Sequence, residues 1–190
     1  IPAYNHEKYI AMAVQSACTQ TYSPVEVIVI DDGSNDGTRS VVRGLQDKYE
    51  FHFIENGKNI GLTKSLNTAL KSAQGKYVSL LAGDDYWALD KIATQVTFME
   101  QHPEVAACTG KVITIDGEGK PRRTIFKMKA KTVIYYDFAA FFELECTFPA
   151  SVMVSKDMLT QIGGYDERFI MEDLPLWLKL SSRGWKLAVL

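Results

Sequence analysis

Two patterns of apolar residues alternate along the first half of the chain. β-Branched or aliphatic runs, typical of strands covered on both faces, occupy 25–30, 51–55 and 77–81. Between them, apolar residues recur at helical spacing in 10–18, 38–45, 62–73 and 89–99, and His102-Pro103 ends the last of these segments. Strands and helices that follow each other at this pace predict a mainly parallel sheet with helices on both faces.

After Pro103 the pattern changes. Residues 105–115 read as a strand, and the turn at 116–119 could close a hairpin with 124–127. Further on we expect a short helix at 136–143, a strand at 150–154, and helices at 156–162 and 174–182. Because no repeat or linker separates the halves, we expect one α/β domain over 1–190, with the second half an elaboration of the first.

Both ends of the sequence look cut. The chain opens on Ile1-Pro2 at the expected end of a strand, and it stops at Leu190 inside another apolar run. We therefore expect a fragment of a longer protein.

Composition excludes few classes of protein. The chain has 190 residues, 46% hydrophobic and 23% charged, with a formal net charge of −2. Such a balance gives no electrostatic reason to expect a nucleic-acid partner. The three cysteines, Cys18, Cys108 and Cys146, are odd in number and widely spaced, which favours buried thiols over a disulfide framework.

Polar clusters follow three of the expected strands at their carboxyl ends, where parallel α/β sheets bind ligands. Pro2-Ala3-Tyr4-Asn5 offers a ring that could stack on a base, although a packing tyrosine is an equal alternative. Asp31 to Thr38 offers carboxylates beside glycines. This stretch could equally be a helix-capping turn. It is not an EF-hand loop, because a strand precedes it and Arg43 stands at the twelfth position.

The third cluster, Gly83-Asp84-Asp85, places two adjacent carboxylates at a strand end. Such a pair suits Mg²⁺ or Mn²⁺ carrying a diphosphate, although a capped turn is an alternative. Far along the chain, Glu172-Asp173 begins an apolar helix. Acids are favoured there by the helix dipole, but this pair could also supply a general base.

These motifs occur together in an order that resembles a known family. The residues that carry the resemblance are Ile1 to Asn5, Asp31 to Ser34 with Asp36 to Thr38, Asn59 to Leu62, Gly83 to Asp85, Gly163 to Glu167, and Glu172-Asp173. Across essentially the whole chain they resemble family 2 glycosyltransferases of the GT-A type, which build bacterial cell-surface polysaccharides. The resemblance implies a three-layer α/β/α fold, with a mainly parallel central sheet and a smaller antiparallel portion.

The resemblance also implies an activity: inverting transfer of a sugar from a nucleotide-diphosphate sugar, usually UDP-linked, to an acceptor hydroxyl. Pro2, Tyr4 and Asp32 would hold the base, with Asp84 near the ribose or donor sugar. Asp85 would ligate Mn²⁺ or Mg²⁺, and Asp173 would be the catalytic base, supported by Glu172. The nucleotide-binding half would span about 1–103 and the acceptor half about 104–190.

The acceptor would be a saccharide or a lipid-linked sugar. The implied location is the cytoplasm, at the inner face of the membrane through peripheral association of the full-length protein. Tyr165, Phe169 and Trp177 are candidates to flank the acceptor, although core positions are the commoner use of such residues.

One position departs from the family pattern. Ala82 stands where many members carry another aspartate, which weakens the ribose assignment of Asp84. An alternative is a non-catalytic nucleotide-sugar-binding module, against which the presence of Asp85 and of Glu172-Asp173 argues. A nucleotidylyltransferase would need a glycine-rich basic loop after the first strand, and a dehydrogenase would need G-x-G-x-x-G. Neither motif is present.

Overall fold

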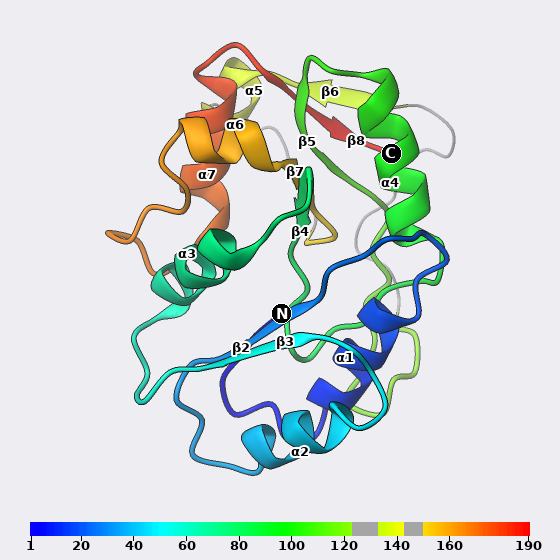
Figure 1. Ribbon diagram of the computed structural model, residues 1–190. Helices are drawn as coiled ribbons and strands as arrows, with labels where there is room; N and C mark the ends of the chain where they lie inside the picture. Colours follow the sequence, from blue (N-terminus) through cyan, green and yellow to red (C-terminus); the bar gives the residue numbers. More distant parts are fainter. Residues whose placement is uncertain (123–132, 143–149) are drawn as a thin grey trace.

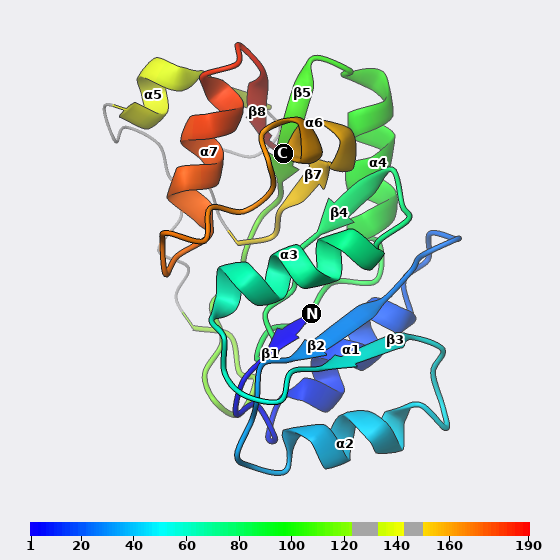
Figure 2. The ribbon, with the colours of Figure 1, turned by 60° about the vertical axis from the view of Figure 1, so that its left-hand side comes forward.

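The computed structural model describes residues 1–122, 133–142 and 150–190. Its first sheet is parallel, with the strand order β1-β2-β3. The strands are β1 (Pro2–Ala3), β2 (Ile28–Asp31) and β3 (His52–Glu55), and the connecting helices are α1 (Ile10–Cys18), α2 (Thr38–Leu45) and α3 (Leu62–Ser72). In Figure 2 this sheet lies between α3 above and α1 and α2 below.

A second sheet is mixed, with the strand order β4-β7-β5-β8-β6. It contains β4 (Tyr77–Ser79), β5 (Val105–Thr109), β6 (Ile134–Tyr136), β7 (Met153–Ser155) and β8 (Lys186–Val189). Among the described strands of this second sheet, only the β5–β8 pair is parallel. The helices of this part are α4 (Lys91–Gln101), α5 (Phe138–Phe142), α6 (Lys156–Gln161) and α7 (Asp173–Ser181). Figure 1 shows the two sheets one above the other, with the amino terminus between them.

Many of the apolar residues predicted to face inward do so, although Leu89 precedes α4 and is 59% exposed. Ile10, Ala13, Val14 and Ala17 of α1 pack with Val29 of β2 in one core cluster. The second sheet is covered by α4 on one face, through Ile92, Val96 and Met99, and by α7 on the other, through Leu176, Trp177 and Leu180. Helices on both faces of the strands give the expected three layers.

Several predicted boundaries were wrong for local reasons. The strand predicted at 105–115 ends at Thr109, before Gly110, which has no side chain to pack in a sheet. Ile115 makes only an isolated bridge to Pro121. The helix predicted at 136–143 is β6 followed by α5, because the Asp137 carboxylate accepts a hydrogen bond from the Ala140 N–H and starts the helix there. The hairpin partner predicted at 124–127 lies outside the described residues.

Helix α3 fixes the loop that leads to α7. The Asn67 side chain accepts a hydrogen bond from the Tyr165 N–H and donates one to the Tyr165 carbonyl, both at 2.9 Å. Gly164 makes this approach possible: its φ is +76°, and a Cβ there would lie 2.7 Å from Asn67 Oδ1. The Thr63 hydroxyl also donates to the Phe169 carbonyl at 3.3 Å. The loop therefore approaches α7 from a fixed position on the first half of the chain.

We expect Asn67→Ala to lower the free energy of unfolding by about 2 kcal/mol or more, because a backbone N–H and C=O beside buried Tyr165 lose their partner. Urea unfolding of both proteins measures the difference. Thr68→Ala is the control: asparagine and threonine have similar helix propensities, and the Thr68 hydroxyl bonds only the Lys64 carbonyl of its own helix. An equal loss in the two variants would refute the role of Asn67.

Candidate functional site

The loops that follow β1 and β2 are joined by reciprocal hydrogen bonds. The Asn5 N–H donates to Ser34 Oγ at 2.9 Å, and Asn5 Oδ1 accepts from the Asn35 N–H at 2.9 Å. Two residues further along each loop, the Glu7 N–H donates to Asp36 Oδ2 at 3.1 Å, while Glu7 Oε2 accepts from the Gly37 N–H at 3.0 Å. The ring of Tyr4, 41% exposed, projects from this joined pair of loops.

Asp31 holds the β2 loop from inside. Its buried Oδ2 accepts from the N–H groups of Gly33 and Ser34 and from Arg39 Nε, the last at 2.6 Å. Gly33 has φ +76°, and a Cβ there would lie 2.4 Å from the backbone of Lys58 and Asn59. A side chain at position 33 would therefore push the β2 loop off the loop that follows β3.

Asp32 is buried and already forms several hydrogen bonds. Its Oδ1 accepts from the Asn56 side chain and the Ile60 N–H, and its Oδ2 from the Gly61 N–H, all at 2.9 Å. Burial alone would raise the pKa of this carboxyl, but the hydrogen bonds together hold the pKa below its ordinary value. The Ser65 hydroxyl is a further hydrogen-bond partner of this carboxylate, so donors within the protein match the four acceptor positions that a carboxylate offers.

The third polar loop packs under the first. Gly83 lies against His6 and Pro2: a Cβ on Gly83 would stand 2.3 Å from His6 Nδ1 and 3.1 Å from the Pro2 carbonyl oxygen. Beyond Gly83, the exposed carboxyl groups of Asp84 and Asp85 accept no hydrogen bond from the described residues. Partial burial, and then the neighbouring Asp84, raise the pKa of Asp85, while His6 opposes the shift.

A cavity of about 400 Å³ joins Asp85 to Glu172 and Asp173. Asp85 belongs to the loop after β4, whereas the other two carboxyl groups begin α7. Tyr86 and Trp87 contribute aromatic rings to the same wall. The fold thus brings acidic groups from both halves of the chain to one cavity.

The two acids at the start of α7 differ in environment. Burial raises the pKa of Glu172, and the adjacent Asp173 adds to the shift. Asp173 is exposed in the first turn of the helix, and its Oδ1 accepts from the Leu174 N–H at 2.6 Å. Its exposed carboxylate borders the cavity, so Asp173 is placed to accept a proton from a bound group.

Acidic side chains of the site fit a divalent cation that is shared with a ligand. Within 1–122, 133–142 and 150–190 no three His, Cys, Asp or Glu side chains form a metal-binding group. Mg²⁺ is commonly bound through one or two carboxylates together with substrate phosphates, which needs no larger protein cluster. Asp85, with its raised pKa and no donor among its described neighbours, suits that arrangement.

The predicted site residues divide into two groups. Asp85, Glu172 and Asp173 line the cavity, whereas Pro2, Tyr4, Asp32 and Asp84 lie outside its wall. The last four belong to the adjoining loops after β1, β2 and β4, and their roles stay predictions. Tyr165 and Trp177 line the cavity but are 5% and 6% exposed and belong to the core, while Phe169 is 48% exposed.

Sequence reasoning missed a lysine in the cavity wall. Lys91 is buried at the start of α4, and burial lowers its pKa to about 7. Its Nζ donates to Ser79 Oγ at 2.7 Å and lies 4.0 Å from the centre of a Trp87 ring. A lysine in the first turn of an amphipathic helix reads as a surface residue, so the pattern gave no signal.

Known proteins resemble the chain along its whole length. The model of a family described as glycosyl transferase family 2 matches residues 1–163. Over 185 residues, 97% of this chain and 71% of the relative, the sequence is 31% identical to a putative teichuronic acid biosynthesis glycosyltransferase, TuaG, of Bacillus subtilis. It is 28% identical to the amylovoran biosynthesis glycosyltransferase AmsE of Erwinia amylovora, covering 99% of this chain and 70% of that protein.

Solved structures show the same fold. TarS 1-349 of S. aureus matches all of this chain with a TM-score of 0.80 at 24% identity, and its complex with UDP matches with a TM-score of 0.77 at 22% identity. The mannosyltransferase PcManGT of Pyrobaculum calidifontis, solved with GDP-Man and Mn²⁺, matches with a TM-score of 0.73 at 21% identity. The chain spans 56% of the first two structures and 55% of the third. The predicted three-layer GT-A fold is thereby confirmed.

We expect Asp85→Asn to stabilise the metal-free protein slightly. Because the folded protein binds the Asp85 proton more tightly than the unfolded chain, the ionised carboxylate destabilises the fold at pH 7, and this effect is lost as the pH falls through the raised pKa of Asp85 toward the ordinary pKa of aspartate. Solvent screens an exposed carboxylate, so the rise in Tm at pH 7 should be about 1–2 °C.

Thermal unfolding at pH 7 and pH 4, in chelator, measures this difference. Asp47→Asn is the control, since Asp47 is exposed and makes no hydrogen bond among the described residues. A lower Tm for the Asp85→Asn variant than for the parent at pH 7 would contradict the destabilising effect assigned to this carboxylate.

Proposed function

The chain belongs to glycosyl transferase family 2 and is a glycosyltransferase, and on that premise we propose that it moves a sugar from a UDP-sugar to an acceptor hydroxyl with inversion and with help from a divalent cation. One observation carries the proposal: the cavity that Asp85 shares with Glu172 and Asp173. A donor diphosphate at Asp85 and an acceptor hydroxyl at Asp173 would then lie in the same cavity.

The donor end of the site would be built from the joined loops. Tyr4 is exposed, so its ring could stack on a base, and Asp32 would help to hold the base by fixing the backbone of Ile60 and Gly61 beside it. Pro2 holds the first loop against Gly83, which keeps the base-binding and diphosphate-binding parts in contact. Asp84, beside Asp85, would face the ribose or the donor sugar. UDP is present in a TarS structure of the same fold, which supports the choice of this nucleotide.

Asp85 would hold Mn²⁺ or Mg²⁺ against the diphosphate. A bound cation would neutralise the negative charge that grows on the leaving nucleotide. The raised pKa of Asp85 favours such binding, because a cation relieves the repulsion from Asp84. Mn²⁺ in the PcManGT structure supports the use of a divalent metal by this fold.

Asp173 would remove the proton from the acceptor hydroxyl as that oxygen attacks the anomeric carbon. Attack from the face opposite the nucleotide inverts the configuration at this carbon. Glu172, whose pKa is raised by burial and by the adjacent Asp173, would position the acceptor beside Asp173. A binding module without catalysis would need no such pair beside Asp85.

The acceptor is proposed to be a saccharide, free or lipid-linked. A relative 40% identical over 100 residues, WfaP of Escherichia coli, is named for glucosyl transfer from UDP-Glc to a diphosphoundecaprenol-linked sugar, but the chain covers only 39% of it. Every described helix is too short or too polar to cross a bilayer. We therefore propose that contact with a membrane, at its cytoplasmic face, would be peripheral in the full-length protein.

We expect the protein to bind UDP only when Mn²⁺ is present, and Asp85→Ala to lose that metal dependence with at least a tenfold drop in affinity. Calorimetric titration with UDP and GDP, with and without Mn²⁺, measures both effects. The control is Asp90→Ala, an exposed aspartate on the same loop that lies outside the cavity wall. Equal UDP affinity with and without Mn²⁺ in the parent would rule out the metal assignment.

Asp173→Asn should leave the Kd for UDP within about threefold of the parent and lower kcat by about 10²-fold or more, the usual contribution of a general base. Donor consumption in the presence of acceptor saccharides measures turnover. Asp157→Asn is a matched control, because Asp157 occupies the first turn of α6 as Asp173 occupies that of α7. If Asp173→Asn transferred sugar at the parent rate, the base would have to be another residue.

A further inference from the structure

Tyr86 follows Asp85 directly and lines the same cavity. Its side chain is 44% exposed. The other aromatic rings described in this wall are less accessible, because Tyr165 and Trp177 are buried in the core and Trp87 is half-buried. Tyr86 therefore offers the aromatic surface that a ligand in this part of the cavity can best reach.

The hydroxyl group of Tyr86 is also available. It makes no hydrogen bond with the residues that the structure describes. A tyrosine hydroxyl can both donate and accept a hydrogen bond, and it usually finds a partner when it is covered. Tyr86 thus brings an apolar ring and an unbonded polar group to the wall of the cavity.

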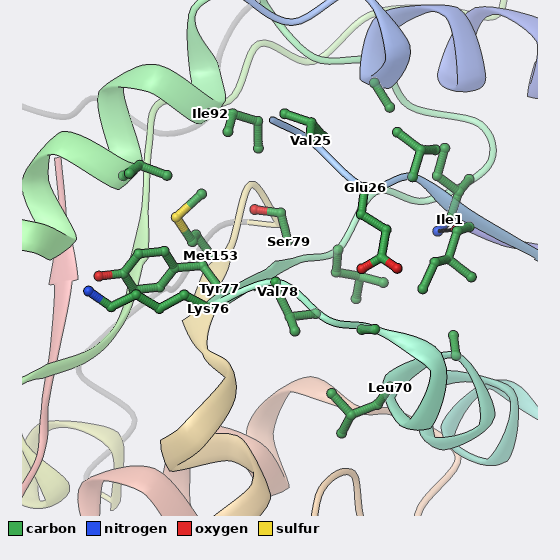
Figure 3. Close-up of a pocket in the computed structure, with 18 of the residues that line it drawn as sticks. Ile1, Val25, Glu26, Leu70, Lys76, Tyr77, Val78, Ser79, Ile92 and Met153 are labelled. Atoms are coloured by element: carbon green, nitrogen blue, oxygen red, sulfur yellow. Dashed lines mark hydrogen bonds between the residues drawn. The ribbon is translucent and has the colours of Figure 1, made fainter. Parts of the chain in front are cut away.

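A second cavity, of about 330 Å³, shows the contrast (Figure 3). Tyr77 and Ser79 of β4 line it, but their hydroxyl groups are already engaged. The Tyr77 hydroxyl donates to Glu100 Oε1 at 3.0 Å, and Ser79 Oγ accepts from Lys91 Nζ at 2.7 Å. These two hydroxyl groups stabilise the fold, whereas that of Tyr86 is left for a ligand.

The loop that carries Tyr86 is held in place at the next residue. The Trp87 N–H donates to Ser16 Oγ at 3.1 Å, and the Trp87 side chain packs against two of the apolar core clusters. The Nζ of buried Lys91 lies 4.0 Å from the centre of a Trp87 ring and is itself held by Ser79. The backbone at Tyr86 therefore has little freedom to lose when a ligand binds.

The proposed function places a sugar beside this ring. If Asp85 binds the donor diphosphate through a cation, the sugar joined to that diphosphate begins close to Asp85, and Tyr86 is the next residue of the chain. Asp173, which would bind the acceptor hydroxyl, belongs to α7 instead. A sugar can pack its C–H groups on an aromatic ring and can form hydrogen bonds with a tyrosine hydroxyl.

We propose that Tyr86 binds the sugar of the donor, with its ring against one C–H face and its hydroxyl hydrogen-bonded to a sugar hydroxyl. The inference rests on the proposed function, because it takes a nucleotide-sugar as the ligand of the cavity. It gives the transferred sugar an apolar contact, which the acidic residues of the site cannot provide.

Calorimetric titration in the presence of Mn²⁺ tests the proposal, with UDP, UDP-glucose, UDP-galactose and UDP-N-acetylglucosamine as ligands. For the UDP-sugar that the parent binds most tightly, we expect Tyr86→Ala to raise the Kd about tenfold, and Tyr86→Phe, which keeps the ring, to raise it about threefold. The Kd for UDP should stay within about twofold of the parent in both variants, because UDP lacks the sugar.

Tyr22→Ala is the control, since Tyr22 is also exposed but lines the second cavity. Tyr86→Ala should keep the Tm within about 2 °C of the parent, because the ring that it removes is exposed.

Three results would each overturn the proposal: an unchanged Kd for the UDP-sugar in Tyr86→Ala, an equal loss of affinity for UDP and the UDP-sugar, or an equal loss in Tyr22→Ala. A parent that binds no UDP in the presence of Mn²⁺ would instead refute the proposed function, and the assignment of Tyr86 with it.

Discussion

The hydrogen bonds between the Asn67 side chain and the Tyr165 backbone are the contact on which the geometry of the site most depends. The acids of the cavity come from two parts of the chain, and the approach of the Gly164–Phe169 loop to α3 adds to the packing of α7 on the second sheet in setting their relative position. An amide side chain suits this task, because it satisfies a donor and an acceptor of the same residue at once. Its loss would release the loop that leads into α7 from α3, while the buried face of α7 would still pack on the second sheet.

Two carboxyl groups with raised pKa values line the same cavity. Asp85 and Glu172 both have pKa values raised by burial and by an adjacent carboxylate. Elsewhere in the described structure, carboxylates such as Asp31 and Asp166 are matched by arginine or lysine. Acidic groups that lack a basic partner and line one cavity are typical of a site that binds a cationic or proton-donating ligand.

Much of the fold could be predicted from the sequence, because strands and helices alternate regularly in its first half. Helices α1 and α3 lie within about a residue of their predicted ranges, since each has a clear apolar face and a clear end. The second half was harder, because a single hydrogen bond from the Ala140 N–H to the Asp137 carboxylate marks where the strand ends and the helix begins, which no periodicity reveals. For the site, the sequence motifs identified Asp85, Glu172 and Asp173 as candidates. They did not identify Lys91, because its contacts with Ser79 and Trp87 cannot be read from the apolar pattern of its helix. The bond between Asn67 and Tyr165 is equally invisible without coordinates, as it joins residues about a hundred positions apart.

The reciprocal bonds between the Asn5–Glu7 and Ser34–Gly37 segments have a consequence for binding. Each loop alone would lose conformational freedom on contact with a nucleotide, and that loss would weaken the complex. Joined to each other in the free protein, the two loops already have little freedom left to lose. On the proposed function, a nucleotide bound against the joined loops would meet a preorganised surface, so its affinity should depend on the contacts it makes rather than on the ordering of the chain around it.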